Sequence, residues 1–460
     1  MPEARAIVVD AEWLYARMSG RSAADIRDSI TLLIEAGELS AGTQLPTIRD
    51  FARVAGISVG TVADAWGALR KQALIETHRR GGTIVAAGAR AAVIRPRTSA
   101  GFPGWAHVDL VQSNADVTLQ PSLAPALLSG LDAVELNTSG RDQMTERLRA
   151  VIEPTWPFEA EAWMTAGGGT EALLLATAAA APRGSIIAVD EPVVPGYLET
   201  LGDLGVTPIG LSSDEHGPTV ESLRAALMAG AVAFVFQPGG PFALDRSVSQ
   251  ERANELAEVI REHREPIWVI EDDSVGPLAV ETPPSMGALI PGRVLRIRSF
   301  CRAYGIDLRT SVLGGSAELV RRSIAERSHG LGSNSRILQN ALAYLVSDGA
   351  AQASVDRARE RYASRRAALL SELIRMGLRP LSGPDSLIVW IEVDNEVDAL
   401  VALASRGISV GSGRKTFVSL PNRGLLRISV TQLPDDRPLI AELAGLIAGA
   451  VGGTLREYFD

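Results

Sequence analysis

Hydrophobic residues recur at two different spacings along the chain, and the spacing changes near residue 107. Before that point Ile26, Ile30, Leu33 and Ile34 lie three or four positions apart, which is the spacing of one buried helix face. After it, short runs rich in Val, Ile and Phe alternate with helical stretches. This alternation predicts an α/β fold with a mostly parallel sheet and helices on both of its faces. The clearest apolar runs are 185–189, 231–236, 267–270, 294–297, 386–392 and 425–430.

Three helical patterns followed by a pair of strands occupy residues 13–86. The first helix ends at Gly37, and a loop is predicted over 37–46. Thr47 caps the second helix, with Asp50 placed to complete a capping box, and Ser58 caps the third. Two short strands then surround a turn at 78–82. Three helices, with a short turn before the third, and a hairpin predict a winged helix-turn-helix.

In that fold the third helix enters the major groove of DNA, and its first residues face the base edges. Arg79 and Arg80 lie at the tip of the predicted wing, where they suit phosphate or minor-groove contacts. We therefore predict double-stranded operator DNA as a partner; the alternative is a three-helix module that binds protein. The first residues of the third helix are Ser58, Val59, Gly60, Thr61, Ala63 and Asp64.

The stretch IEAGELSAGTQLPTIRDFARVAGISVGTVADAWGALRKQALIETHRRGGTIVA, residues 34–86, resembles the GntR family of bacterial regulators. The resemblance implies DNA contacts from Arg49, Ser58, Thr61 and the wing, which includes Gly82. The family usually places an arginine after the serine of the third helix, and Val59 stands there in this chain. The affinity or the base preference is therefore expected to differ from that of relatives.

Charge supports an N-terminal location for the DNA contact. The net charge of the 460-residue chain is −9, yet residues 1–98 carry 13 basic and 10 acidic side chains. A Pro-, Gly- and Arg-containing linker is predicted over 87–106. No apolar run is long enough to span a membrane, the one cysteine excludes an internal disulfide, and a cytoplasmic location is expected. The five histidines lack metal-ligand spacing, so no metal site is predicted.

Residues 107–460 resemble the fold-type I pyridoxal-phosphate aminotransferases. Together with a GntR head, this is the architecture of the MocR subfamily of regulators. The resemblance implies a large subdomain over 107–371, a small α+β subdomain over 372–460, and a homodimer. The matching segments are TAGGGTEALLLA (165–176), VDEPVVPGYLETL (189–201), VIEDDSVGPL (269–278), RSFCRAYGIDLRTSVLGG (298–315) and LLRISV (425–430).

The same resemblance assigns roles around the cofactor. The turn at Gly168, Gly169 and Thr170 would receive the cofactor phosphate at a helix N-terminus. Asp272 would pair with the pyridine nitrogen, which makes the ring an electron sink. Arg427 takes the place of the arginine that binds the substrate carboxylate.

The departures from the family are concentrated at the cofactor. In the run Ser299-Phe300-Cys301-Arg302, Arg302 replaces the lysine that forms the Schiff base. A guanidinium with a pKa above ~12 cannot form an imine near neutral pH. Val194 replaces the aromatic residue that stacks on the ring, and Gly240 replaces the asparagine that bonds the ring oxygen. The chain has only two lysines, Lys71 in the head and Lys415 in the small subdomain, while Asp272, Arg309 and Arg427 are retained.

These features predict a non-enzymatic regulator that dimerises and senses a small anionic effector bearing a phosphate or a carboxylate, with no covalent cofactor. Two alternatives stay open. The protein could use pyridoxal phosphate noncovalently, as a regulator or as an aminotransferase, or the large domain could be only a dimerisation scaffold. Arg302 could also close the site by pairing with Asp272. The predicted pocket comprises Gly168, Gly169, Thr170, Val194, Asp272, Ser299, Arg302, Arg309 and Arg427.

Overall fold

The computed structural model divides the chain into two units, one of residues up to 108 with 395–409 and one of residues 109–394 with 410–452. The predicted linker, 87–106, and the wing residues Arg79 and Arg80 lie outside the described residues. The described residues are 9–18, 20–35, 38–72, 74–78, 82–86, 108–133, 136–137, 142–240, 242–244, 248–328, 332–419, 421 and 423–452.

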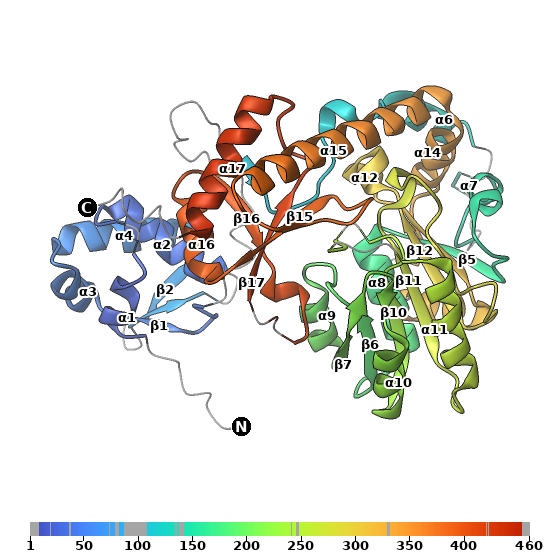
Figure 1. Ribbon diagram of the computed structural model, residues 1–460, viewed down its shortest axis with the longest axis horizontal. Coiled ribbons are helices and arrows are strands. Elements are labelled where there is room, and N and C mark those ends of the chain that lie inside the picture. The colour runs from blue at the N-terminus through green and yellow to red at the C-terminus, as the bar shows by residue number, and fades with distance from the viewer. Residues whose placement is uncertain are drawn as a thin grey trace. The chain divides into compact units, whose positions relative to one another are not determined.

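The first unit contains the predicted helices and hairpin (Figure 1). The loop prediction over 37–46 is wrong at its end, because Gln44 and Leu45 form a strand that pairs antiparallel with β3. Two residues are too short a run for alternation to be visible in the sequence. The three strands have the order β1-β3-β2. The elements are α1 (Ala11–Tyr15), α2 (Ala23–Glu35), β1 (Gln44–Leu45), α3 (Ile48–Ala55), α4 (Val59–Lys71), β2 (Ile75–His78) and β3 (Gly82–Val85).

Both predicted helix caps of this unit are confirmed. Thr47 Oγ1 accepts the Asp50 N–H at 3.1 Å, and Ser58 Oγ accepts the Thr61 N–H at 3.0 Å. Each such cap satisfies an N–H that has no partner inside the helix, which is worth about 1 kcal/mol. The apolar faces of the helices meet in one core, which includes Ile30 of α2 and Trp66 of α4.

A seven-stranded sheet forms the centre of the second unit (Figure 1). Strand β13 pairs antiparallel with β12 and β5, whereas the other four pairings are parallel. The predicted mostly parallel sheet is therefore confirmed. In sheet order the strands are β5 (Ala162–Ala166), β13 (Ser311–Gly315), β12 (Val294–Ser299), β11 (Trp268–Asp273), β10 (Ala231–Phe236), β6 (Ile186–Asp190) and β7 (Thr207–Leu211).

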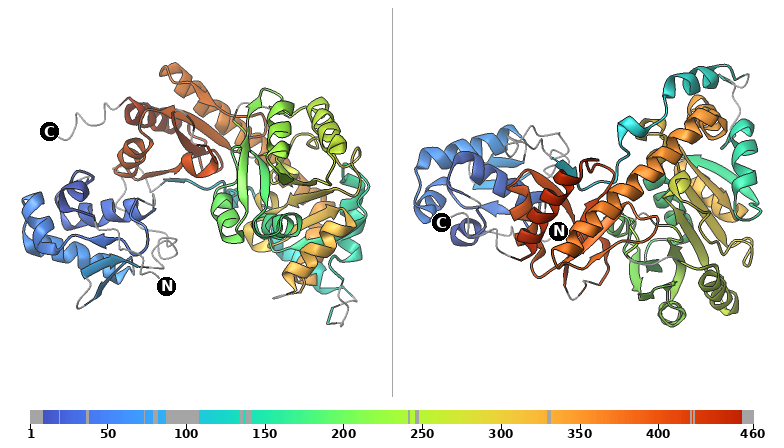
Figure 2. Two further views of the ribbon diagram at one scale, coloured as in Figure 1. Left: turned by 90° about the horizontal axis from the view of Figure 1, so that it is seen from below. Right: turned by 45° about the horizontal axis from the view of Figure 1, so that its top comes forward.

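Helices cover both faces of this sheet, which explains why its strands read as continuous apolar runs (Figure 2). In β10, Ala233 and Val235 pack with α8, α9 and α13, whereas Phe234 and Phe236 pack with α10 and α11. The helices are α6 (Leu123–Leu131), α7 (Glu146–Ile152), α8 (Gly169–Ala180), α9 (Tyr197–Leu204), α10 (Val220–Met228), α11 (Gln250–Glu262), α12 (Cys301–Tyr304), α13 (Ala317–Arg327) and α14 (Arg336–Ser347).

A second sheet has the order β14-β15-β17-β16-β4. The long helix α15 (Gly349–Arg375) contacts α12 near the large sheet and β14, β15 and α17 at the second sheet, so it runs through the boundary predicted at 371–372. No described helix is long and apolar enough to cross a membrane. The remaining elements are β4 (Val108–Leu110), β8 (Ser213–Asp214), β9 (Gly217–Pro218), β14 (Pro380–Leu381), β15 (Ile388–Val393), β16 (Ile408–Ser412), β17 (Gly424–Ser429), α16 (Glu396–Ala404), α17 (Arg437–Val451) and the short 3-10 turns η1 (Val117–Leu119), η2 (Glu153–Thr155), η3 (Gly276–Leu278), η4 (Ile306–Leu308) and η5 (Arg414–Thr416).

Candidate functional site

Helix α4 exposes its first turn, where the base-reading residues are predicted. The Val59 side chain is 51% exposed and Gly60 is exposed, whereas Val62 and Trp66 are buried. Ser58 Oγ lies 2.8 Å from Thr61 Oγ1, in addition to capping the helix. One face of α4 therefore belongs to the core of the head, and the opposite face of the first turn is accessible.

Arg49, near the start of α3, is exposed and forms no ion pair with a described residue. It lines a hollow together with Gln44, Thr47 and Gly82. Gly82 has a φ of +75°, and a Cβ there would lie 2.7 Å from Gln44 Nε2. The structure thus brings Arg49 close to the base of the predicted wing, while the wing tip lies outside the described residues.

The turn predicted to bind a phosphate precedes α8. Gly168 caps this helix with a φ of +131°, and Gly169 is its first residue. A Cβ on Gly169 would lie 3.3 Å from Ser299 Oγ, so these two predicted site residues are neighbours. Thr170 is exposed.

A carboxylate of the chain itself lies at this turn. Glu171 accepts a hydrogen bond from the Gly167 N–H. The same carboxylate forms an ion pair with Arg327, with 3.2 Å between Oε1 and Nε. One of the amide groups near the start of α8 is therefore already bonded to an anion.

Asp272 lies at the end of β11 and is 2% exposed. Burial raises the pKa of its carboxyl group to about 6, an effect that Arg302 opposes and Asp273 reinforces. Within the described part of the chain, the only hydrogen bond to its carboxylate is a long one from Ser274 Oγ, at 3.4 Å. Arg302 and Asp272 form no ion pair, so the structure does not contain the predicted alternative of a direct bridge between them.

The raised pKa of Asp272 predicts a pH-dependent effect of Asp272→Asn. Because the folded state disfavours the ionised form, the parent loses stability as pH rises from about 4 through about 6, and the asparagine variant does not. The unfolding free energy of the variant, relative to the parent, should therefore increase by about 3 kcal/mol between pH 4 and pH 7. Urea unfolding at a series of pH values measures this difference.

The adjacent carboxylate provides a control. Burial of Asp273 would raise its pKa, but Arg296 and Arg298 outweigh burial and hold the pKa below its ordinary value. Asp273→Asn should therefore lose stability relative to the parent as pH rises. A pH-independent difference for Asp272→Asn would show that Asp272 titrates normally.

Arg302 extends from α12 toward backbone and hydroxyl groups. Its Nη1 donates to the Ser274 carbonyl oxygen at 2.7 Å, and its Nε donates to Ser113 Oγ at 3.3 Å. The guanidinium carbon lies 5.7 Å from the centre of the Phe242 ring. A residue with these bonds serves as a hydrogen-bond donor to the surrounding loops.

Arg427 of β17 is buried, and no described acidic side chain forms an ion pair with it. It is 5% exposed, its Nε has no partner among the described residues, and its Nη2 donates to the Val111 carbonyl oxygen at 3.2 Å. Burial lowers the pKa of its guanidinium to about 10. A Cβ on Gly411 would lie 2.5 Å from Arg427 Nε, so the glycine in the neighbouring strand makes space for the guanidinium. A buried cation with an unused donor is suited to bind an anion.

Phe242 connects the two arginines. Its ring centre lies 5.6 Å from the guanidinium carbon of Arg427 and 5.7 Å from that of Arg302. Phe242 is buried in a cluster that includes Trp390, whose Nε1 donates to the Phe242 carbonyl oxygen at 3.0 Å. Val194 is half-buried and packs against the same cluster.

Arg309, in contrast, does not join this group through its side chain in the described structure. It is exposed and has a φ of +44°, and its carbonyl oxygen accepts a bond from Asn334 Nδ2 at 3.4 Å. Its backbone lies beside Gly167, whose Cβ would be 4.0 Å from the Arg309 oxygen.

A buried ion network extends from the same strands. Arg296 is 0% exposed and donates to Glu271 at 2.9 Å and to Asp273 at 3.1 Å. Arg298 adds a second bond to Asp273 at 3.1 Å and reaches Thr155. Every member lies in or near β11 and β12, so the network holds the strand that carries Asp272.

Comparison with known proteins identifies both parts of the chain. Residues 110–441 match the family of class I and II aminotransferases. The chain belongs to this family. Residues 22–85 match the gntR family of bacterial regulatory proteins, which agrees with the fold of the first unit. This aminotransferase-family chain therefore carries a GntR-type helix-turn-helix head, as the sequence predicted.

Two curated relatives match most of this chain over most of their own length. The vitamin B6 salvage pathway transcriptional repressor PtsJ of Salmonella typhimurium is 26% identical over 91% of this chain and 96% of the repressor. The uncharacterized HTH-type transcriptional regulator YjiR of Escherichia coli is 26% identical over 86% of this chain and 92% of its own.

Solved structures confirm the fold of the aminotransferase-like part. Kynurenine aminotransferase of Pyrococcus horikoshii has a TM-score of 0.68 at 18% identity, over 77% of this chain and 92% of that one. A single mutant of aspartate aminotransferase from Thermus thermophilus has a TM-score of 0.66 at 20% identity, over 76% and 92%.

Several residues that matter to this geometry were not predicted. Phe242 lies two residues after Gly240, at a position to which the family resemblance assigns no role, and Glu171 is an ordinary residue in the first turn of α8. Val111 and Ser113 lie before all the segments that resemble the aminotransferases, so only the tertiary structure connects them with Arg427 and Arg302.

Proposed function

We propose that this protein is a DNA-binding transcriptional regulator of the GntR/MocR type whose second unit binds a small carboxylate noncovalently at Arg427. The observation that carries the effector proposal is the buried Arg427 guanidinium, which has an unused Nε and no acidic partner among the described residues. The head and the full-length similarity to two transcriptional regulators support the DNA-binding role.

The residues present do not fit covalently held pyridoxal phosphate. At the position that resembles the family's lysine, Arg302 offers a guanidinium engaged with Ser274 and Ser113. Val194 offers no ring for stacking, and Glu171 places a negative charge beside the turn that would hold the phosphate. We therefore assign no catalytic residue and no aminotransferase reaction to the chain.

Noncovalent vitamin B6 is the second candidate effector, because PtsJ is named for the vitamin B6 salvage pathway. The two candidates differ in the group that Arg427 would bind. A carboxylate can accept two parallel hydrogen bonds from the Arg427 guanidinium. The phosphate group of pyridoxal phosphate would instead bind at the turn before α8, where the Glu171 carboxylate already lies.

The effector site is connected to the segment that follows the predicted linker. Arg427 binds the Val111 carbonyl oxygen, and Arg302 binds Ser113 two residues later. An effector carboxylate at Arg427 would compete with the Val111 carbonyl oxygen for the same donors. Displacement of this segment would change the path of the chain from the second unit toward the head. The effector would then bind the conformation with the segment displaced more tightly than the conformation with the segment in place, which is what a ligand-driven switch requires.

We also propose a homodimer, as in the MocR regulators that the chain resembles. Two heads would then bind two half-sites on operator DNA, direct or inverted, separated by turns of the duplex. In each head the exposed apolar Val59 is suited to contact a thymine methyl group in the major groove.

Arg49→Ala tests the DNA-binding face. Loss of one phosphate contact should weaken DNA binding at low salt and reduce the slope of log affinity against log salt concentration by about 1. Replacing both Arg79 and Arg80 by Ala should reduce the slope by about 2. Fluorescence anisotropy of a labelled duplex over a range of salt concentrations measures these slopes.

Arg17→Ala is the matched control, because it removes the same charge from the head but its guanidinium already pairs with Glu38 at 3.2 Å. Its slope should equal that of the parent. Equal slopes for the parent and for the Arg49 and wing variants would mean that DNA binds elsewhere.

A further inference from the structure

The side of α4 that faces away from the core of the head carries an acid between two glycines. Val62 and Trp66 are buried in that core, so the residues half a turn away from them lie on the accessible side of the helix. Asp64 is the first charged residue on this side and Lys71, the last residue of the helix, is the next. At helical spacing the accessible side consists of Gly60, Asp64, Gly67 and Lys71.

The Asp64 carboxylate has no partner within the described part of the chain. The side chain is exposed and forms neither an ion pair nor a hydrogen bond with a described residue. The positions three and four residues away, which a helix brings beside it, carry only glycine, threonine and alanine. The nearest basic residue of the helix, Arg70, donates to Thr77 Oγ1 at 3.3 Å. The carboxylate can therefore accept hydrogen bonds from a molecule outside the chain.

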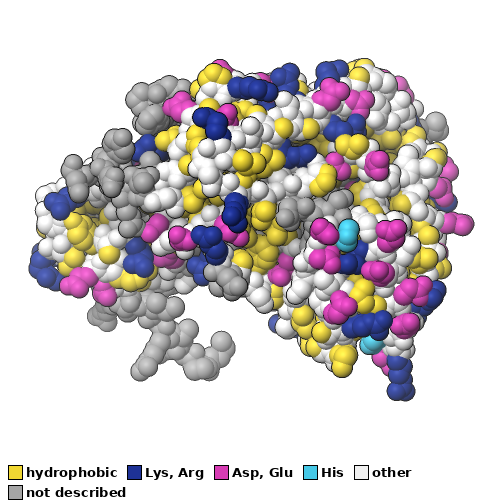
Figure 3. Space-filling model, viewed as in Figure 1, with side chains coloured by type: hydrophobic (Ala, Val, Ile, Leu, Met, Phe, Trp, Pro, Cys, Tyr) yellow, Lys and Arg dark blue, Asp and Glu magenta, His cyan; other side chains and the backbone are white. Residues whose placement is uncertain are grey.

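The position of Asp64 distinguishes it from the other exposed acids. Basic and acidic side chains are interspersed over the face of the molecule that Figure 3 shows, so an exposed acid is ordinary on this chain. Asp64, however, lies on the helix that enters the major groove in a winged helix-turn-helix. A negative charge there opposes the attraction between the head and the DNA phosphates. A contact with a base would offset this cost.

The two glycines allow a short side chain to reach the bases. The nearest side-chain atom to a Cβ built on Gly60 would be Ser58 Oγ, at 3.6 Å. For a Cβ on Gly67 it would be Arg70 Nη2, at 3.9 Å, so there is open space on both sides of Asp64. Because glycine has no side chain, the backbone of α4 can approach the base edges closely at these two positions. An aspartate needs this close approach, since its carboxylate lies only one carbon beyond Cβ.

The chemistry of a carboxylate selects one base. An ionised aspartate accepts hydrogen bonds and donates none. In the major groove guanine and thymine present acceptors, whereas cytosine presents the donor N4 amino group. Adenine also has an amino group, but its N7 acceptor lies beside it and would repel the second carboxylate oxygen. The edge of cytosine therefore matches a carboxylate best.

We propose that Asp64 determines specificity by accepting a hydrogen bond from the N4 amino group of a cytosine in each half-site. This inference rests on the DNA-binding role proposed above and adds the base that one residue reads. It also gives a source of specificity to a helix that has no arginine or lysine before Arg70, since the usual guanine contact requires one of these residues.

The test is selection of bound duplexes from a random pool by the full-length parent, Asp64→Asn and Asp64→Ala. We expect the parent to select cytosine at one position of each half-site. Asp64→Asn should select adenine there, because an asparagine amide matches the N6 and N7 groups of adenine, and Asp64→Ala should accept any base. With duplexes that differ only at this base pair, the parent should discriminate about tenfold and Asp64→Ala less than about twofold.

Asp28→Asn is the matched control, because it removes the same charge from the head. Asp28 lies on α2, where it pairs with Arg27 at 2.8 Å. Its selected motif should equal that of the parent, even if loss of an acid raises the affinity for all duplexes.

The outcomes separate this inference from the DNA-binding role. If the parent selects a motif that both Asp64 variants select unchanged, Asp64 reads no base, while the DNA-binding role stands. Loss of discrimination at a position where the parent prefers a base other than cytosine would overturn the assignment of the base. If the parent selects no motif, the inference and the proposed sequence-specific recognition fail together.

Discussion

Arg296→Met is expected to lower the unfolding free energy of the second unit by about 3–5 kcal/mol. Methionine replaces the unbranched aliphatic part of the arginine side chain but has no guanidinium. Glu271 and Asp273 therefore stay buried without the cation that both contact. Breaking a buried ion pair costs more than the pair itself contributes, because the remaining charge keeps its desolvation penalty. Glu271 retains bonds from Ser285 and the Met286 N–H, which limits the loss.

A second change separates charge from packing. Glu271→Gln in the Arg296→Met background removes the stranded charge and should recover part of the lost stability, with a coupling of about 0.5–3 kcal/mol. Arg293→Met is the control: among the described residues the Arg293 side chain donates only to the Ile260 carbonyl oxygen, so its loss should cost about 1 kcal/mol. Hydrogen exchange of peptides from β11 and β12 in increasing urea reports these differences. Equal costs at Arg293 and Arg296 would mean that the network contributes nothing specific.

Arg427→Met is expected to raise the unfolding free energy of the ligand-free protein, whereas Arg296→Met lowers it. Burial lowers the pKa of the Arg427 guanidinium from its ordinary value to about 10, so the charged side chain destabilises the fold at every pH below about 10. That cost, on the order of 3 kcal/mol, is relieved only as pH rises above about 10. Removing the charge should therefore stabilise the ligand-free protein at neutral pH by a similar amount. The same substitution should abolish any rise in melting temperature caused by carboxylates.

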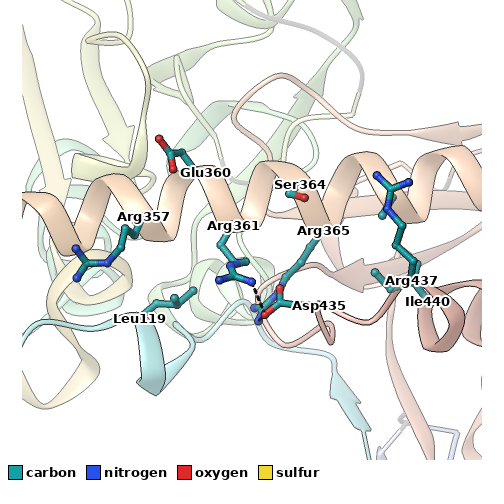
Figure 4. Close-up of a pocket in the computed structure, with 10 residues that line it drawn as sticks. Leu119, Arg357, Glu360, Arg361, Ser364, Arg365, Asp435, Arg437 and Ile440 are labelled. Carbon is teal, nitrogen blue, oxygen red and sulfur yellow. Dashed lines mark hydrogen bonds and ion pairs between the residues drawn. The ribbon is translucent and has the colours of Figure 1, made fainter.

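Arg365 is a matched control for this prediction. Its exposed fraction, 6%, is nearly that of Arg427, 5%, but it pairs with Asp116 and Asp435. Arg365→Met should destabilise the protein, because it takes the guanidinium away from Asp116 and leaves Asp435 paired with Arg361 alone (Figure 4). Gly411→Ala should also perturb the effector site, since a Cβ there would contact the Arg427 guanidinium. If Arg427→Met destabilises the ligand-free protein as Arg365→Met does, Arg427 is structural and the effector proposal fails.

The sequence predicted features whose signals are local. The caps at Thr47 and Ser58, the apolar runs of β10 and β12 and the α/β architecture all follow from short-range patterns, and the structure confirms them. Strand β1 was missed because its pairing with β3 spans some forty residues and involves only two positions.

The contacts of the proposed effector site could not be predicted from the spacing of residues in the sequence. Arg427 was identified by resemblance, but nothing in LLRISV indicates that its Nε lacks a partner or that Val111 accepts from it. Phe242 and Arg302 are 60 positions apart and meet only because β10 and β12 lie in one sheet.

We propose that this chain recognises DNA in a sequence-specific way through the first turn of α4. Gly60→Asp provides a sharp comparison, because a Cβ at Gly60 meets only Ser58 Oγ at 3.6 Å, and an acid near a helix start is compatible with the helix dipole. The aspartate would, however, place a negative charge on the exposed DNA-facing turn. Gly60→Ala separates the effect of added bulk from that of charge.

The most direct measurement is selection of bound duplexes from a random oligonucleotide pool by the full-length protein, followed by sequencing. We expect the parent to enrich a discrete motif of two half-sites, Gly60→Asp to lose that enrichment, and Gly60→Ala to retain the motif with a smaller change in affinity. Recovery of random sequences by the parent, or of the same motif by Gly60→Asp, would contradict it.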